Sequence, residues 1–160
     1  MITGLLVSTF RLSTPLLLGA LGEVFVERTG VMNIAIEGIF LMGAWGGFVG
    51  AYLSGSLLVG FLLAIAMGVA FGAVYGLITV KLKQHQIVTG VALNILALGL
   101  GLFLYRVLFG VPLLPLTVSP LKDLSIPLLS KIPVIGPALF SQNILTYLAL
   151  ALIPVGYWVL

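Results

Sequence analysis

The sequence predicts an all-α fold, a polytopic bundle of transmembrane helices with about four to five membrane segments. Hydrophobic residues make up 61% of the 160-residue chain and the mean hydropathy is +1.32, whereas only 7% of the residues are charged. A soluble domain is about one-quarter charged, and so few charges cannot cover a surface that faces water. Long charge-free stretches are the third observation, because a helix needs about 20 apolar residues to cross the hydrocarbon core.

Charge-free stretches locate the individual helices. The stretch 38–80 contains no charged residue and is long enough for two crossings. Ser54, Gly55 and Ser56 form its polar and flexible point, where we expect the turn. The expected spans are 38–53, 57–80, 86–105 and 144–160.

A shorter apolar run, 12–22, lies near the start of the chain. It is too short to span alone and crosses the membrane only if its helix continues through Glu23 and Glu27. These two carboxylates lie four residues apart, so on a helix they share a face, where Arg28 or Arg11 can neutralise them. No cleavage site of the signal-peptide type follows this run.

The charged and proline-rich segments predict the orientation of the spans. Lys81, Lys83 and His85 lie in a short loop between two strong spans, and short basic loops tend to be cytoplasmic. The segment 106–143 contains most of the chain's eight prolines and its single Asp, Asp123. Proline at this density interrupts helices, so we expect an external loop that packs through its Leu, Ile and Val residues.

Small residues recur every four positions along the expected 57–80 helix and predict a face for helix packing. Such spacing lets two backbones approach closely, which drives helix association inside a membrane. Plain scaffolding explains this pattern without any role in transport. The residues of the expected packing face are Gly60, Ala64, Gly68, Gly72 and Gly76.

Polar residues within the apolar segments are the candidate site residues, because they persist in a membrane where they are paired or face water. Asn33 and Glu37 are four residues apart, between Gly30 and Gly38, and predict a broken or re-entrant helix near 28–38 whose polar groups border a cavity.

A third candidate, Asn94, lies deep in the 86–105 span. It either lines the same path or hydrogen-bonds a neighbouring helix. Asn33, Glu37 and Asn94 together form the predicted substrate path.

Several classes of site are not expected. The chain has no Cys and one His, so we predict no disulfide and no metal site, and nothing points to another cofactor. It lacks the GxxxxGK[ST] phosphate-binding loop and any catalytic constellation, so we predict neither an ATPase nor another enzyme. A net charge of +3 from scattered residues predicts no nucleic-acid patch.

Two motifs resemble one family of membrane proteins. The run "ERTGVMNIAIEGIFLMGA", residues 27–44, is similar to a segment of the membrane subunits of ABC importers for nucleosides, which are relatives of the ribose and galactose permeases. The run "IVTGVALNILALG", residues 87–99, is similar to a second helix of that family, and it follows a basic loop. Together with the expected hydropathy, the two blocks cover nearly the whole chain.

The resemblance implies that residues 1–160 are the N-terminal part of one transmembrane permease domain about twice as long, in a bacterial inner or plasma membrane. It implies import of nucleosides or simple sugars with an ATP-binding subunit, an extracytoplasmic solute-binding protein and a second permease subunit as partners. A non-transporting membrane scaffold or a small channel stays open as the alternative.

Overall fold

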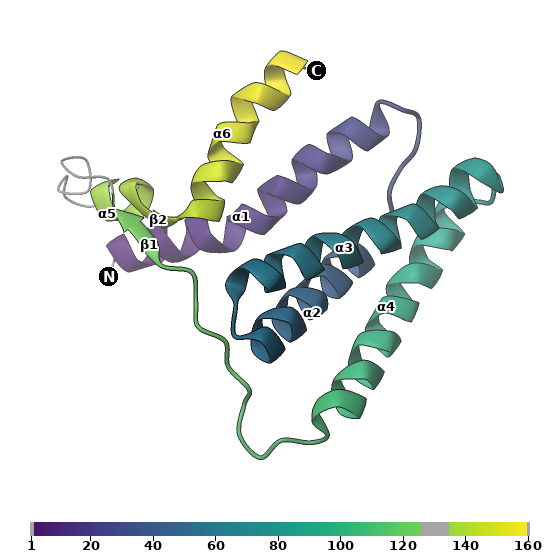
Figure 1. The fold of residues 1–160 in the computed structure, drawn as a ribbon. Helices are drawn as coiled ribbons and strands as arrows, with labels where there is room; N and C mark the ends of the chain where they lie inside the picture. Colours follow the sequence, from purple (N-terminus) through teal and green to yellow (C-terminus); the bar gives the residue numbers. More distant parts are fainter. Residues whose placement is uncertain (1, 126–134, 160) are drawn as a thin grey trace. The chain divides into compact units, whose positions relative to one another are not determined.

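The computed structural model describes residues 2–125 and 135–159, so part of the expected external loop, 126–134, lies outside the described residues. Helices dominate (Figure 1), which confirms the all-α fold class. In chain order the elements are α1 (Ile2–Glu27), α2 (Ile36–Ser54), α3 (Leu57–Gly76), the π-helical turn η1 (Leu77–Lys81), α4 (Gln86–Phe109), β1 (Asp123–Ser125), α5 (Ile135–Phe140), β2 (Ser141–Asn143) and α6 (Ile144–Val159).

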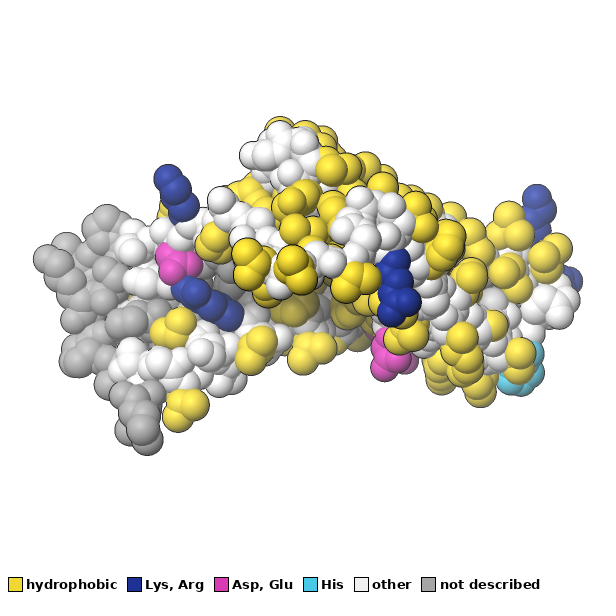
Figure 2. Space-filling view, turned by 90° about the horizontal axis from the view of Figure 1, so that it is seen from below, with side chains coloured by type: hydrophobic (Ala, Val, Ile, Leu, Met, Phe, Trp, Pro, Cys, Tyr) yellow, Lys and Arg dark blue, Asp and Glu magenta, His cyan; other side chains and the backbone are white. Residues whose placement is uncertain are grey.

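Four helices of the described part are long and apolar enough to cross a membrane, which supports a multi-pass membrane protein. They are Thr3–Glu27, Ile36–Ser54, Leu57–Lys81 and Gln86–Phe109. The first span forms because α1 extends well beyond the apolar run in both directions and includes both glutamates. Helix α6 is also apolar, but its 16 residues are fewer than the about 20 that a helix needs to cross the hydrocarbon core. Figure 2 shows a face on which hydrophobic side chains are widespread and charged ones few.

The chain divides into two compact units, and the first consists of residues 29–119. Within it, α2 and α3 lie side by side as an antiparallel pair (Figure 1). The predicted turn between them is confirmed, because α2 ends at Ser54 and α3 begins at Leu57. Gly55 has φ +66°, a left-handed conformation that glycine adopts without steric cost and that commonly ends a helix.

Contact between α2 and α3 is closest around Gly60. A Cβ atom added to Gly60 would lie 2.7 Å from the carbonyl oxygen of Gly47 and 2.8 Å from the Cβ of Ala51. Ala64 packs beside the same part of α2, since a Cβ on Gly47 would lie 3.3 Å from its Cβ. Only a residue without a side chain permits this backbone approach.

The rest of the expected packing face lies farther from its neighbours. A Cβ at Gly68 or Gly72 would meet only Ile39, at 3.8 and 3.9 Å, which is ordinary van der Waals contact. At Gly76 an added Cβ would have no described atom within 4 Å. The close approach of α2 and α3 therefore lies in the N-terminal half of α3, rather than along all five small residues.

The other unit consists of residues 1–28 and 120–160, so it joins α1 to the segment that contains β1, α5, β2 and α6. Strands β1 and β2 pair antiparallel, with Leu124 opposite Gln142. These short strands are part of the segment that the sequence predicts as an external loop. Within this unit, α5 contacts α1 and β2 contacts α6.

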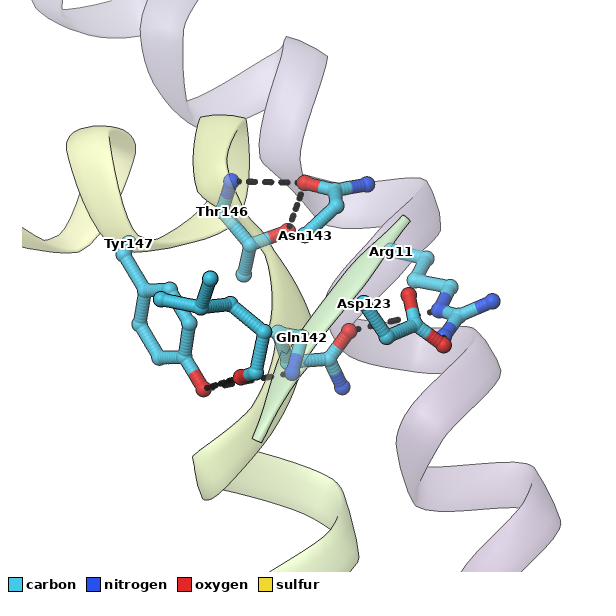
Figure 3. Close-up of polar contacts among 7 residues, drawn as sticks. Arg11, Asp123, Gln142, Asn143, Thr146 and Tyr147 are labelled. Carbon is cyan, nitrogen blue, oxygen red and sulfur yellow. Dashed lines mark hydrogen bonds and ion pairs between the residues drawn. The ribbon is translucent and has the colours of Figure 1, made fainter. Parts of the chain in front are cut away.

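A polar network holds this unit together (Figure 3). Arg11 of α1 forms an ion pair with Asp123, at 2.5 Å, and its Nε donates to Oε1 of the fully buried Gln142, at 3.3 Å. The hydroxyl of Tyr147 accepts from the backbone N–H of Gln142 and donates to the carbonyl of Leu124, at 3.2 and 3.0 Å. Arg11 therefore pairs with Asp123 and not with Glu23 or Glu27, which leaves Arg28 as the other expected partner of these two glutamates.

Two threonines connect α1 to α6 in the same network. The hydroxyls of Thr14 and Thr146 lie 3.0 Å apart, and both side chains are buried. Asn143 accepts from the backbone N–H and the hydroxyl of Thr146, at 2.9 and 3.0 Å (Figure 3), and so satisfies a donor in the first turn of α6. Hydroxyl pairs of this kind join helices where water is absent.

Candidate functional site

The predicted helix break is present as a non-helical segment between the end of α1 at Glu27 and the start of α2 at Ile36. Gly30 in this segment has φ +81°, which favours glycine and stops helical continuation. The expected boundary at Gly38 is wrong, since the helix resumes two residues earlier and Gly38 lies in its first turn. Asn33 therefore lies outside the helix and does not share a helical face with Glu37.

Asn94 of α4 holds both sides of the point where α2 begins. Its Nδ2 donates to the carbonyl of Ile34, at 3.0 Å, and its Oδ1 accepts from the N–H of Gly38, at 2.8 Å. The first N–H groups of a helix have no partner within that helix, and Ala35 at the N-cap supplies no side-chain hydrogen bond. Asn94 thus acts as a capping residue supplied by a neighbouring helix.

Gly38 and Gly90 allow the backbone to come this close to α4. A Cβ on Gly38 would lie 2.9 Å from Oδ1 of Asn94. On Gly90 it would overlap the Cβ of Ile34 and lie 2.9 Å from the Ile34 carbonyl carbon. A larger residue at either position would push the non-helical segment away from α4.

Two further side chains fix Met32 in the non-helical segment. Gln86, the first residue of α4, accepts from the N–H of Met32 through its Oε1, at 2.9 Å. The hydroxyl of Tyr75 in α3 donates to the carbonyl of Met32. Tyr75 is 3% exposed and packs with Ala35 and Leu93 in the buried core. The irregular backbone thus has its polar groups satisfied by neighbouring helices, as a membrane interior requires.

A cavity of about 250 Å³ opens beside this segment. Glu37 and Asn94 supply its charged and amide groups, so the structure brings these two predicted residues together. Asn33 is not among the lining residues. The lining consists of Glu37, Gly38, Leu41, Asn94, Ile95 and Leu98.

The cavity is suited to a neutral, hydroxyl-bearing solute. Glu37 is exposed, and its carboxylate can accept hydrogen bonds from hydroxyl groups. Asn94 also lines the cavity, and its two hydrogen bonds use one of its two N–H groups and one of its two oxygen lone pairs. Apolar side chains make up the rest of the lining, as in most small-molecule sites.

Sequence reasoning missed Tyr75 and Gln86. Tyr75 lies within an apolar stretch and resembles an ordinary core aromatic, while Gln86 directly follows the basic loop. A polar residue at the start of an apolar helix was the signal in the sequence that could have identified Gln86. For Tyr75 the sequence offers none, because its partner is a backbone carbonyl far away in the chain.

Comparison with known proteins identifies the group to which the chain is similar. It is 36% identical to the putative glucose ABC transporter permease TsgC13 of Haloferax volcanii, over 98% of this chain and 47% of that protein. It is 34% identical to the guanosine permease NupQ of Bacillus subtilis, over 96% of this chain and 50% of that protein. The nucleoside permease NupC of Lactococcus lactis is also 34% identical, over 92% and 49%.

The chain thus spans about half the length of the curated relatives it matches. No solved structure matches it. Residues 5–160 match the family described as "Branched-chain amino acid transport system / permease component". With nearly its whole length matched, and with apolar helices that suit a membrane, the chain belongs to this family of transport-system permeases.

Proposed function

We propose that this chain forms part of the translocation path of an ABC importer for nucleosides or simple sugars. The observation that carries the proposal is the cavity at the helix break, where Glu37 and Asn94 meet within otherwise apolar helices. An exposed carboxylate among apolar helices requires a polar neighbour, and a hydroxyl-rich solute is one. The names of the relatives, which include guanosine, nucleoside and glucose permeases, support the same class of solute.

The proposed importer resides in the cell membrane and needs three kinds of partner. A separate ATP-binding subunit supplies energy, since the chain has no phosphate-binding loop. An extracytoplasmic solute-binding protein delivers the solute, and a second permease subunit completes the path. Asn33, Glu37 and Asn94 remain the residues proposed to border that path.

A structural role as a membrane scaffold is the second candidate. The observation in its favour is that both polar atoms of the Asn94 side-chain amide bond to the backbone, Nδ2 to Ile34 and Oδ1 to Gly38. An asparagine that only fixes the backbone needs no solute. Glu37 separates the two candidates, because no described hydrogen bond or ion pair explains its presence beside the cavity.

Uptake by the complete transporter tests the proposal. Cells that lack their own nucleoside and glucose uptake would express the complete permease with its ATP-binding and solute-binding partners. We expect accumulation of labelled guanosine or glucose, and we expect Glu37→Gln to reduce it although the complex still assembles. If neither solute is taken up, the importer role is contradicted. If uptake in Glu37→Gln is normal, the role of Glu37 is contradicted.

A further inference from the structure

The cavity at the helix break continues as a groove between α2 and α4. A second cavity, of about 380 Å³, shares Leu41 and Leu98 with the first. Both helices contribute residues at helical spacing, so the two cavities follow one face of each helix. From α2 the groove is lined by Glu37, Leu41, Ala44, Trp45 and Phe48, and from α4 by Asn94, Leu98, Gly101, Leu102 and Tyr105.

The two ends of this α2–α4 groove differ in chemistry. Glu37 and Asn94 make one end polar. Trp45, Phe48 and Tyr105 make the other end aromatic. The aromatic lining suits this end to a flat ligand that can stack on a ring.

The aromatic end is held in place by ring contacts. The ring centroid of Phe48 lies 6.4 Å from that of Tyr105 and 5.9 Å from that of Phe109, where the two rings meet edge to face. One turn before Tyr105 on the same helix, Gly101 leaves room, because an added Cβ would have no described atom within 4 Å. A planar ring system can therefore enter beside the aromatic side chains and stack on them.

We infer that the α2–α4 groove binds a nucleoside, with the base at Trp45 and Tyr105 and the ribose at Glu37 and Asn94. The inference rests on the proposed importer function and selects the nucleoside over the free sugar. A sugar would use only the polar end. A lipid chain or an apolar helix in the groove would leave the carboxylate of Glu37 without a polar partner.

Filling the aromatic end tests this assignment by uptake. In the complete transporter, Gly101→Leu places a side chain into the groove, and Trp45→Leu removes the stacking surface. We expect each to lower guanosine uptake at least tenfold without loss of assembly. Gly99→Leu is the matched control, since Gly99 has equal room for a Cβ but does not line the groove. Normal guanosine uptake in both groove variants would overturn the inference and leave the importer role intact.

Glucose uptake separates the base site from a general path. If the transporter also imports glucose, the groove variants should lower guanosine uptake by a much larger factor than glucose uptake. Equal loss of guanosine and glucose uptake in an assembled Gly101→Leu transporter would overturn the assignment of the base to the aromatic end. If Gly101→Leu does not assemble, the same comparison of guanosine and glucose uptake in Trp45→Leu tests the assignment.

Binding to the chain supplies a readout that does not depend on transport. The chain has two tryptophans, so Trp158→Phe leaves Trp45 as the only indole. We expect guanosine, and not glucose, to quench Trp45 emission saturably in nanodiscs. Trp45→Phe, which retains Trp158, is the control for light absorption by guanosine. Absence of saturable quenching would overturn the inference, whereas quenching without any uptake would support the groove and contradict the importer function.

Discussion

Asn94 of α4 accepts a hydrogen bond from the backbone N–H of Gly38 in the first turn of α2, at 2.8 Å. The same side chain donates to the carbonyl of Ile34, so it connects the non-helical segment to the helix that follows. A single residue on one helix thus determines where another helix begins.

Removing this connection should loosen the start of α2. We expect Asn94→Leu to lower stability by about 1 kcal/mol, because it leaves the Ile34 carbonyl and the Gly38 N–H without their partner. Hydrogen exchange should accelerate at the backbone amides of residues 34–40, measured by mass spectrometry in detergent. Amides of residues 46–54 in the same helix are the internal reference. Unchanged exchange at 34–40 would show that Asn94 does not hold this segment.

Gly90 offers a test of the contact between α4 and the non-helical segment. Gly90→Ala should destabilise by about 1–3 kcal/mol, because its Cβ would overlap Ile34. Gly99→Ala in the same helix meets no described atom and should be neutral or slightly stabilising, since alanine favours helices. Thermal unfolding in detergent compares the two. Equal melting temperatures would mean that the segment moves away from α4 at little cost.

The α2–α3 contact should depend on one end of α3. We expect Gly60→Ala to lower the melting temperature, because the new methyl would lie 2.7 Å from the carbonyl oxygen of Gly47. Gly76→Ala, in the same helix, should not lower the melting temperature, because an added Cβ there has no described atom within 4 Å. If Gly76→Ala proves the more harmful, partners beyond the described residues contact that end of α3.

The polar network of α1, β1, β2 and α6 should depend more on Tyr147 than on the ion pair. Tyr147→Phe removes hydrogen bonds to Gln142 and Leu124 and should cost about 1–2 kcal/mol. Asp123→Asn should cost less than about 1 kcal/mol, because Arg11 and Asp123 are 42% and 45% exposed and such pairs contribute little. Thermal unfolding at low and high salt measures the stability of both variants. A larger loss of stability in Asp123→Asn than in Tyr147→Phe would contradict this prediction.

Orientation is testable because the chain has no native cysteine. We expect single cysteines at Gln84 and Ser125 to react from opposite sides of the membrane, with Ser125 outside, because short basic loops tend to be cytoplasmic. Both positions are exposed. A membrane-impermeant maleimide applied to intact cells measures the difference. Reaction of Gln84 alone from outside would invert the topology, and reaction of both would place an even number of crossings between them.

Most of the helical architecture was predictable because hydropathy and charge determine which segments enter a membrane. The turn at Ser54, Gly55 and Ser56 and the start of α4 at Gln86 lie where the sequence predicts them. The extent of α1 was harder to predict, because Glu23 and Glu27 lie inside the helix and only tertiary context decides whether a helix continues past them. Strands β1 and β2 are three residues each and depend on pairing across many intervening residues, which local pattern cannot reveal.

Part of the candidate site was also predictable from hydropathy. Polar residues in apolar surroundings are conspicuous, and two of the three, Glu37 and Asn94, line one cavity. The roles of Tyr75 and Gln86 depend on backbone groups of Met32, and the sequence does not show which backbone groups leave the helix. The proposed path role of Asn33, Glu37 and Asn94 stays a prediction that uptake will decide.

The division of the chain into two units has a consequence for biosynthesis. Residues 29–119 are contiguous, so this unit can fold as soon as the ribosome has delivered it. Helix α1 precedes this unit in the chain, yet the partners of its Arg11 and Thr14 belong to the segment after residue 119. Until that segment is made, α1 holds an arginine and a threonine without their final contacts. A chaperone or the insertion machinery that shields polar groups of nascent helices would therefore act on α1 for longer than on any other helix described.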